Sequence, residues 1–192
     1  DNSIGKLNSF SHGNPPSALQ STGNDTQTEK AIKDSVDVRK KPLAEVLPAD
    51  KLKQFLREIP KVDLHRHLEG SIEADTLLSI AASRNIELPA KDAETLKPSI
   101  QITLSDKTLL DFISKFDVIG KAFADDDAIV QVTYEAIKNA NADNVKYAEL
   151  RFSPIYMASQ YGLDARQVIK SVIHGVERAK KDYDTDVRLI LI

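Results

Sequence analysis

The sequence contains no cysteine and carries little excess charge of either sign. The lack of cysteine excludes disulfides, thiolate metal sites and a cysteine nucleophile, so any metal ion must be held by histidine, aspartate or glutamate. A net charge of −3 at pH 7 over 192 residues does not suit a nucleic-acid partner. No apolar run approaches the roughly 18 residues that a membrane-spanning helix needs, so no membrane partner is expected.

Composition divides the chain into two parts. Residues 1–47 are rich in Ser, Asn, Gly, Thr, Lys and Asp, and they bury too little apolar surface to offset the entropy of ordering, so they are expected to form a disordered polar tail or linker. Residues 48–192 have the periodicity of a folded domain. The sequence starts at Asp1 and not at methionine, which leaves a removed signal peptide open. A cytoplasmic location is favoured, with an exported or periplasmic location as the alternative.

The segment 63–71, Asp-Leu-His-Arg-His-Leu-Glu-Gly-Ser, carries the main chemical signal. His65 and His67 lie two residues apart, next to a short buried strand predicted over 61–64, and alternate residues of a strand point to one face. Their Cα atoms would lie about 6.5 to 7 Å apart, which lets both rings reach one metal ion at about 2.0 to 2.1 Å. Arg66 is expected to point the other way. Spacing alone leaves the alternative of two surface histidines in a loop.

Strand and helix patterns alternate along the rest of the chain. Helices are predicted over 50–59, 72–83, 109–116, 129–140 and 164–176, and further strands over 145–152 and 187–192. The last strand is expected to be buried on both faces, as in a parallel sheet. This order predicts an α/β fold, namely the N-terminal part of a (β/α)8 TIM-type barrel, with about three of its eight strands present. His174 lies off the apolar stripe of its helix and is expected at the surface.

Alternation in the strand 145–152 places Tyr147, Glu149 and Arg151 on one face, which is expected to look into the barrel. Two inward charges are costly unless they are paired. A buried ion pair between Glu149 and Arg151 is therefore favoured over a direct chemical role for either residue.

Three blocks resemble the adenosine deaminase family of the metal-dependent amidohydrolase superfamily. Residues 62–72, Val-Asp-Leu-His-Arg-His-Leu-Glu-Gly-Ser-Ile, resemble its first-strand metal motif. Residues 109–117 are similar to the helix that covers its purine pocket, and residues 147–154, Tyr-Ala-Glu-Leu-Arg-Phe-Ser-Pro, look like its second-strand block. The blocks occur in the family's order, and the resemblance assigns 48–192 to the N-terminal part of an amidohydrolase-like barrel domain.

The resemblance implies a zinc-dependent purine deaminase, a hydrolase of C–N bonds in cyclic amidines that converts adenosine to inosine and ammonia in purine salvage. One Zn2+ ion would be held by His65 and His67, and a zinc-bound water would attack the purine carbon that bears the amino group. The family's remaining metal ligands and its acid and base residues have no matching position before Ile192. No catalytic acid or base is therefore expected in this chain, and activity is expected only of the full-length protein.

The resemblance also suggests where the substrate would lie. Leu109, Phe112 and Ile113 correspond to apolar walls of the family's pocket, although their spacing alone is more typical of core residues. Glu69 is a candidate substrate contact at a position where animal adenosine deaminases carry an aspartate that binds the ribose. A plain acid favoured by the dipole of a helix N-terminus is an equal alternative.

Several other functions stay open. The glutamate at position 69 also occurs in deaminases of adenine and related purines, so the substrate is either a purine nucleoside or a base. A metal phosphoesterase is a further alternative, although it would need more histidines soon after the first pair. The last alternative is a non-catalytic fragment. Two histidines also suit iron, cobalt or nickel, and the sequence does not indicate an oligomeric state.

Overall fold

A computed structural model describes residue 42 and residues 47–192, so the predicted polar tail over 1–47 lies almost wholly outside the described residues. The chain divides into two units, Asp1–Ala49 and Asp50–Ile192, and the second holds the sheet and, apart from Ala49, every described helix. No described helix is long and apolar enough to cross a membrane.

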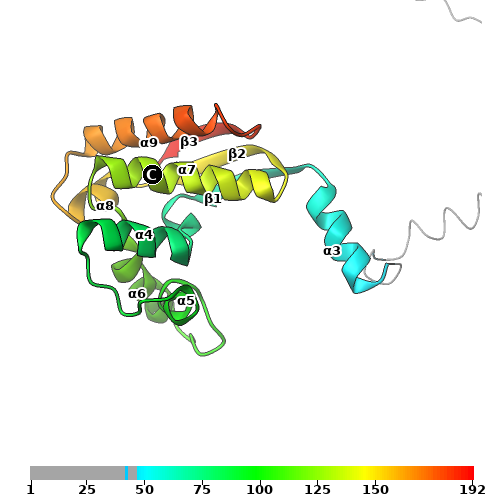
Figure 1. Ribbon diagram of the computed structural model, residues 1–192, viewed down its shortest axis with the longest axis horizontal. Coiled ribbons are helices and arrows are strands. Elements are labelled where there is room, and N and C mark those ends of the chain that lie inside the picture. Colours follow the sequence, from blue (N-terminus) through cyan, green and yellow to red (C-terminus); the bar gives the residue numbers. More distant parts are fainter. Residues whose placement is uncertain (1–41, 43–46) are drawn as a thin grey trace, which may run out of the picture. The chain divides into compact units, whose positions relative to one another are not determined.

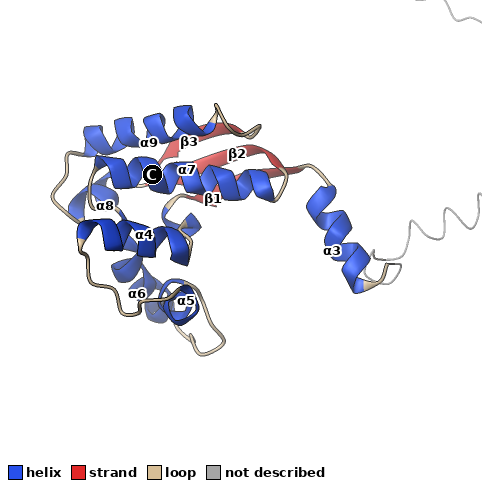
Figure 2. Ribbon diagram, viewed as in Figure 1, coloured by secondary structure: helices blue, strands red, loops and turns tan. Residues whose placement is uncertain are grey.

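The second unit is built on a parallel sheet of three strands, β1 (Lys61–His67), β2 (Val145–Phe152) and β3 (Asp186–Leu191), in the order β1-β2-β3 (Figure 2). Helices connect the strands, as parallel pairing requires. The predicted α/β class with a parallel sheet is therefore confirmed. The strand predicted over 145–152 has the observed bounds of β2.

Seven helices are described, and Figure 1 shows their order along the chain. They are α3 (Ala49–Glu58), α4 (Ala74–Arg84), α5 (Ala93–Ile100), α6 (Leu109–Ile119), α7 (Asp126–Ala142), α8 (Pro154–Ser159) and α9 (Ala165–Ala179). Side-chain N-caps begin five of them, supplied by Asp92, Thr108, Asp125, Ser153 and Asp164. Three-residue 3-10 turns precede α4 (η1, Glu69–Ser71) and follow α6 (η2, Gly120–Ala122).

Helices α7 and α9 lie side by side over one face of the sheet (Figure 1). The side chains of Ala148, Leu150 and Phe152 on β2 are buried in the core, as the alternation of the strand predicts. Gly175 on α9 allows the two helices to approach closely, because a Cβ atom there would lie 2.5 Å from Cβ of Thr133 on α7. His174 is exposed, as predicted.

The outer strands are less buried than the sequence suggests. On β1, Val62 is 64% and Leu64 57% exposed, so the expected burial of the strand over 61–64 is wrong. On β3, Val187 is buried but Leu191 is 56% exposed, so burial on both faces is also wrong for this strand. Helices α7 and α9 pack on one face of the sheet, and side chains that point away from them keep contact with solvent.

Two helices were not predicted from the sequence, and one begins later than predicted. Helix α5 contains Pro98, a residue that normally argues against a helix, and α8 is only six residues long. The helix predicted over 72–83 begins at Ala74, because the chain first forms the turn η1. Strand β1 in turn extends through both histidines of the motif to His67.

Candidate active site

The candidate site lies where β1 and β2 end. His67 is the last residue of β1 and is paired in register with Arg151, the penultimate residue of β2. The backbone N–H of Leu68 then donates to the carbonyl oxygen of Arg151 at 2.9 Å, which keeps the two strand ends together. In parallel barrels the carboxyl ends of the strands carry the chemistry, so this edge is where reactive groups are expected.

His65 and His67 lie close together at this edge. Their ring centroids are 5.3 Å apart with an interplanar angle of 44°, and both residues are exposed. Arg66 points the other way, as predicted, and borders a small void beneath α7 with Ala136 and Leu150. Its Nε atom donates to Oδ2 of Asp63 at 2.8 Å. The register of β1 against β2 is irregular between Asp63 and Arg66, a stretch that includes His65.

The donor set at this edge fits a zinc ion in part. Imidazole nitrogen is a preferred zinc ligand, and the two rings are near enough to tilt toward one centre. Within residues 47–192, however, no group of three or more His, Cys, Asp or Glu side chains is placed to hold a metal. The described residues therefore supply two candidate ligands, His65 and His67, and not a full coordination sphere.

Glu69 follows the pair in the turn η1 and is only 3% exposed. Its Oε1 atom accepts a hydrogen bond from the backbone N–H of Ser153 at 2.7 Å. Its Oε2 atom is buried without a hydrogen-bond partner among the described residues. One oxygen thus links the end of β1 to the start of α8, and the other has unused capacity to accept a hydrogen bond.

The expected ion pair between Glu149 and Arg151 is not among the ion pairs of the described chain, and this prediction is wrong. Glu149 instead accepts a hydrogen bond from the hydroxyl of Tyr147 at 3.2 Å. Burial, and then this bond to Glu149, raise the pKa of Tyr147 above its usual value. The Nε atom of Arg151 is buried and has no partner in the described residues.

A cavity of about 500 Å³ opens beside His67. It is lined by His67, Gly70, Ile100, Gln101, Ile102, Phe112, Lys115, Phe116 and Ile119. Phe112 is the one predicted wall residue in this lining. Leu109 and Ile113 lie on the same helix, α6, but outside the lining, and they are 70% and 49% exposed.

An aromatic cluster supports the α6 side of the cavity. The rings of Phe112 and Phe116 meet edge to face at 5.4 Å, and Phe116 meets Tyr156 of α8 in the same way at 6.2 Å. The Tyr156 hydroxyl donates to the Phe116 carbonyl oxygen at 2.7 Å, and burial raises the pKa of this tyrosine to about 12. The tyrosine is therefore a neutral hydrogen-bond donor that anchors α6 to α8.

The structure adds residues to the site that the sequence analysis missed. Phe116 could have been found, because it lies four residues after Phe112 in the same apolar stripe. The opposite wall, from Ile100 to Ile102, follows from α5, which Pro98 concealed. Lys115 gave no signal in the sequence, because one lysine in a helix is ordinarily a solvated surface residue.

The chain is similar to known proteins over most of its described length. The family model for adenosine deaminase matches residues 60–192. Among curated proteins, the adenosine deaminase of Proteus mirabilis is 43% identical over 133 residues, which cover 69% of this chain and 40% of that protein. The chain therefore spans about 40% of the length of this curated relative.

Solved structures agree in fold. A Burkholderia ambifaria amidohydrolase with bound Zn superposes with a TM-score of 0.61 at 21% identity, covering 76% of this chain and 38% of that one. Arabidopsis ADAL in complex with GMP gives a TM-score of 0.57 at 26% identity, covering 72% of this chain and 41% of that one. These structural neighbours are TIM barrels, so the three strands correspond to part of a barrel, as predicted.

Proposed function

The chain belongs to the adenosine deaminase family, and from this premise we propose that the full-length protein is a zinc-dependent purine deaminase that hydrolyses adenosine to inosine and ammonia. The observation that carries the proposal is the position of His67, which ends β1 beside His65 and also lines the cavity. A candidate metal ligand and a candidate substrate pocket thus share one side chain. The activity is proposed for the whole protein, since the chain spans about 40% of its curated relative.

We propose that His65 and His67 would hold the zinc ion, with further ligands from elsewhere in the full-length protein. A zinc ion bound there would acidify a water molecule toward neutral pKa and so supply the nucleophile for hydrolysis. The end of β1 brings the two imidazole rings to a centroid distance of 5.3 Å. The bond from Leu68 to Arg151 keeps this strand end fixed beside β2, which preorganises the two rings.

The cavity beside His67 would hold the purine. Its α6 wall offers the rings of Phe112 and Phe116, and aromatic faces of this kind stack on a planar heterocycle. Ile100 and Ile102 form an opposite wall that would offer apolar contacts to the bound base. Leu109 and Ile113 would be outer contacts of the substrate, because they lie on α6 with Phe112 and expose apolar surface next to the cavity.

Glu69 favours a second candidate function, the deamination of adenine or a related purine base. We keep Glu69 as a proposed substrate contact through Oε2, which is buried and has no described partner. Its Oε1 atom is engaged by Ser153, and the side chain is only 3% exposed. The glutamate at this position resembles that of deaminases of adenine and related purines, which favours the base.

The experiment that tests the proposal combines metal analysis with activity on the full-length protein. Zinc content is measured by elemental analysis, and deamination of adenosine, adenine and AMP is followed by ultraviolet absorbance. The variants are His65→Ala and His67→Ala, and His174→Ala serves as the matched control, because His174 is an exposed histidine on α9. We expect zinc and adenosine deamination in the wild type and the control, and loss of both in the two site variants.

Other outcomes separate the alternatives. Turnover of adenine without adenosine would replace the nucleoside by the base as substrate. Bound metal with no turnover of any of the three purines would contradict the purine deaminase proposal, and phosphate esters would then be tested. Full activity in both site variants would contradict the assignment of the metal ligands.

A further inference from the structure

Lys115 on α6 makes the most buried ion pair in the described part of the chain. Its Nζ atom lies 2.9 Å from Oδ1 of Asp106, and each side chain is 13% exposed. The same Nζ donates to the backbone carbonyl oxygen of Pro98 at 2.8 Å. A charge removed from water to this extent is stable only when it is paired and hydrogen-bonded, and both conditions hold for this lysine.

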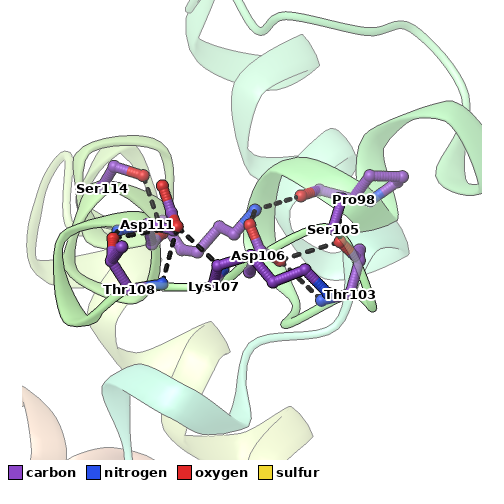
Figure 3. A network of polar contacts seen from close by, with 9 residues as sticks. Pro98, Thr103, Ser105, Asp106, Lys107, Thr108, Asp111 and Ser114 are labelled. Atoms are coloured by element: carbon purple, nitrogen blue, oxygen red, sulfur yellow. Dashed lines mark hydrogen bonds and ion pairs between the residues drawn. The ribbon is translucent and has the colours of Figure 1, made fainter.

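Asp106 is fixed equally well on its other side. Its Oδ2 atom accepts from the backbone N–H of Thr103 at 2.6 Å and from the hydroxyl of Thr103 at 2.9 Å, and Figure 3 shows these contacts within the surrounding polar network. The bonds from Thr103, and then the bond from Lys115, lower the pKa of Asp106 to about 2. The carboxylate is therefore ionised at any pH at which the protein would be assayed.

These contacts join three segments of the chain at one point. Pro98 belongs to α5, Asp106 to the loop 101–108, and Lys115 to α6. The loop itself has little apolar anchorage, since Ile102 is 66% and Leu104 94% exposed. Polar contacts, and not burial of apolar side chains, hold the loop against the two helices.

The same segments form the walls of the cavity beside His67. One wall contains Ile100 and Ile102, which lie between Pro98 and Thr103 in the sequence. The other wall, on α6, contains Phe112 and Phe116. Lys115 lies between these two phenylalanines in the sequence and itself lines the cavity. The bridge from Lys115 to Pro98 and Asp106 therefore connects one wall directly to the other.

We propose that Lys115 and Asp106 are a positioning pair that fixes the separation of the two cavity walls, and so sets the affinity of the site for a planar purine ring. The identity of the ligand rests on the proposed function, whereas the bridge between the walls does not. The pair acts through Phe112, Phe116 and the opposite wall, at a distance from the reacting atoms. Its loss weakens binding in the ground state and the transition state alike, which raises KM and leaves kcat nearly unchanged.

The test uses the full-length protein and the variant Lys115→Met, which keeps the length of the side chain and removes the ammonium. The matched control is Lys138→Met, because Lys138 also makes a 2.9 Å ion pair, with Glu135 on α7, but is half-exposed and lies outside the cavity lining. The measurements are KM and kcat for adenosine, the Kd for inosine by calorimetry, and hydrogen exchange of residues 101–108.

For Lys115→Met we expect KM and the Kd for inosine to rise about tenfold, with kcat within about twofold of the wild type. Exchange in 101–108 should become faster, because the loop loses its main anchor. Asp106→Asn should reproduce both effects, and the double variant should be no worse than the more severe single variant, as expected for two residues that act as one unit. Lys115→Arg should restore part of the affinity, and Lys138→Met should change nothing.

Three results would overturn the proposal. The first is unchanged KM, Kd and exchange in a folded Lys115→Met variant. The second is a fall in kcat at constant KM, which would mean that the pair acts on the chemistry. The third is additive effects of the two single variants.

If Lys115→Met does not fold, Asp106→Asn provides the same readouts. A wild type that neither turns over adenosine nor binds inosine would contradict the proposed function. In that case hydrogen exchange of residues 101–108 in Lys115→Met still tests the bridge: faster exchange would support it, and unchanged exchange would overturn it.

Discussion

Glu69 and Ser153 tie two strand ends together through one hydrogen bond, in which the Ser153 backbone N–H donates to Oε1 of Glu69 at 2.7 Å. The residues are 84 positions apart in the sequence. Ser153 also caps α8 through its side chain, so the bond connects the end of the histidine strand to the first turn of that helix. The carboxylate is buried, which makes the bond stronger than it would be at the surface.

The first prediction follows from this bond. Glu69→Ala removes a charged acceptor and leaves the Ser153 N–H unpaired, so we expect a loss of about 1.5 to 3 kcal/mol in the free energy of unfolding. Glu69→Gln keeps an acceptor oxygen at the same place and should lose less than about 1 kcal/mol. Urea denaturation of the two variants measures the difference. Equal stability of both variants would show that the bond contributes little.

The second prediction concerns the cavity wall on α6. Phe112→Ala removes one ring of the edge-to-face pair with Phe116 and one face against which a purine would stack. Stacking of aromatic rings contributes about 0.5 to 1.5 kcal/mol beyond burial, so KM for the purine substrate should rise about 2- to 12-fold. Leu110→Ala is the control, since Leu110 is 75% exposed on the same helix and does not line the cavity. The same rise in both variants would contradict a specific role for Phe112.

The sequence was informative where one element buries one face. The strand 145–152 was predicted with its observed bounds, because its apolar and polar residues alternate and the core lies on a single side. The two histidines were expected to lie close together, and their ring centroids are 5.3 Å apart. For β1 and β3 the apolar runs were misread as fully buried, since a run of apolar residues does not reveal which of its faces is covered.

The parts that the sequence did not reveal depend on contacts between distant residues. Nothing local in the sequence indicates that Glu69 meets Ser153 or that Lys115 reaches Pro98, because each contact is set by how separate elements pack. Helix α5 was concealed by Pro98, although its N-cap, Asp92, accepts from the Thr95 N–H and gives a recognisable start. The part of the cavity wall from Ile100 to Ile102 was therefore missed together with this helix.

The third prediction tests the packing of α7 against α9. A Cβ atom at Gly175 would lie 2.5 Å from Cβ of Thr133 and 2.9 Å from the carbonyl oxygen of Val130, and the two helices would have to separate. Overpacking of this kind costs about 1 to 3 kcal/mol, against a gain of up to about 1 kcal/mol from the better helix propensity of alanine. Gly175→Ala should therefore lower the melting temperature. Lys170→Ala, at an exposed position of α9, should leave it nearly unchanged, and a raised melting temperature in Gly175→Ala would contradict the close approach.

Arg84 and Asp125 form a two-bond ion pair between the end of α4 and the start of α7. Nε of Arg84 donates to Oδ2 of Asp125 at 2.7 Å, and a second guanidinium nitrogen donates to Oδ1 at 2.8 Å. Asp125 also caps α7 by accepting from the Ala128 N–H at 2.8 Å. The bond from Arg84 is the main cause that lowers the pKa of Asp125 below its usual value.

The fourth prediction is the pH dependence of this pair. Because folding lowers the pKa of Asp125, its contribution to stability is complete above the unfolded value of about 3.9 and is lost as pH falls through the lower folded value. The Asp125 side chain is 49% exposed and screened by solvent, so Asp125→Asn, which keeps the cap, should cost only about 0.5 to 1 kcal/mol at pH 7. Urea denaturation at pH 7 and pH 3 measures the cost, which should shrink at the lower pH.

Asp164→Asn, at a cap that makes no ion pair among the described residues, should cost less at pH 7. A cost for Asp125→Asn that is the same at both pH values would mean that the cap, and not the charge pair, stabilises this corner of the fold.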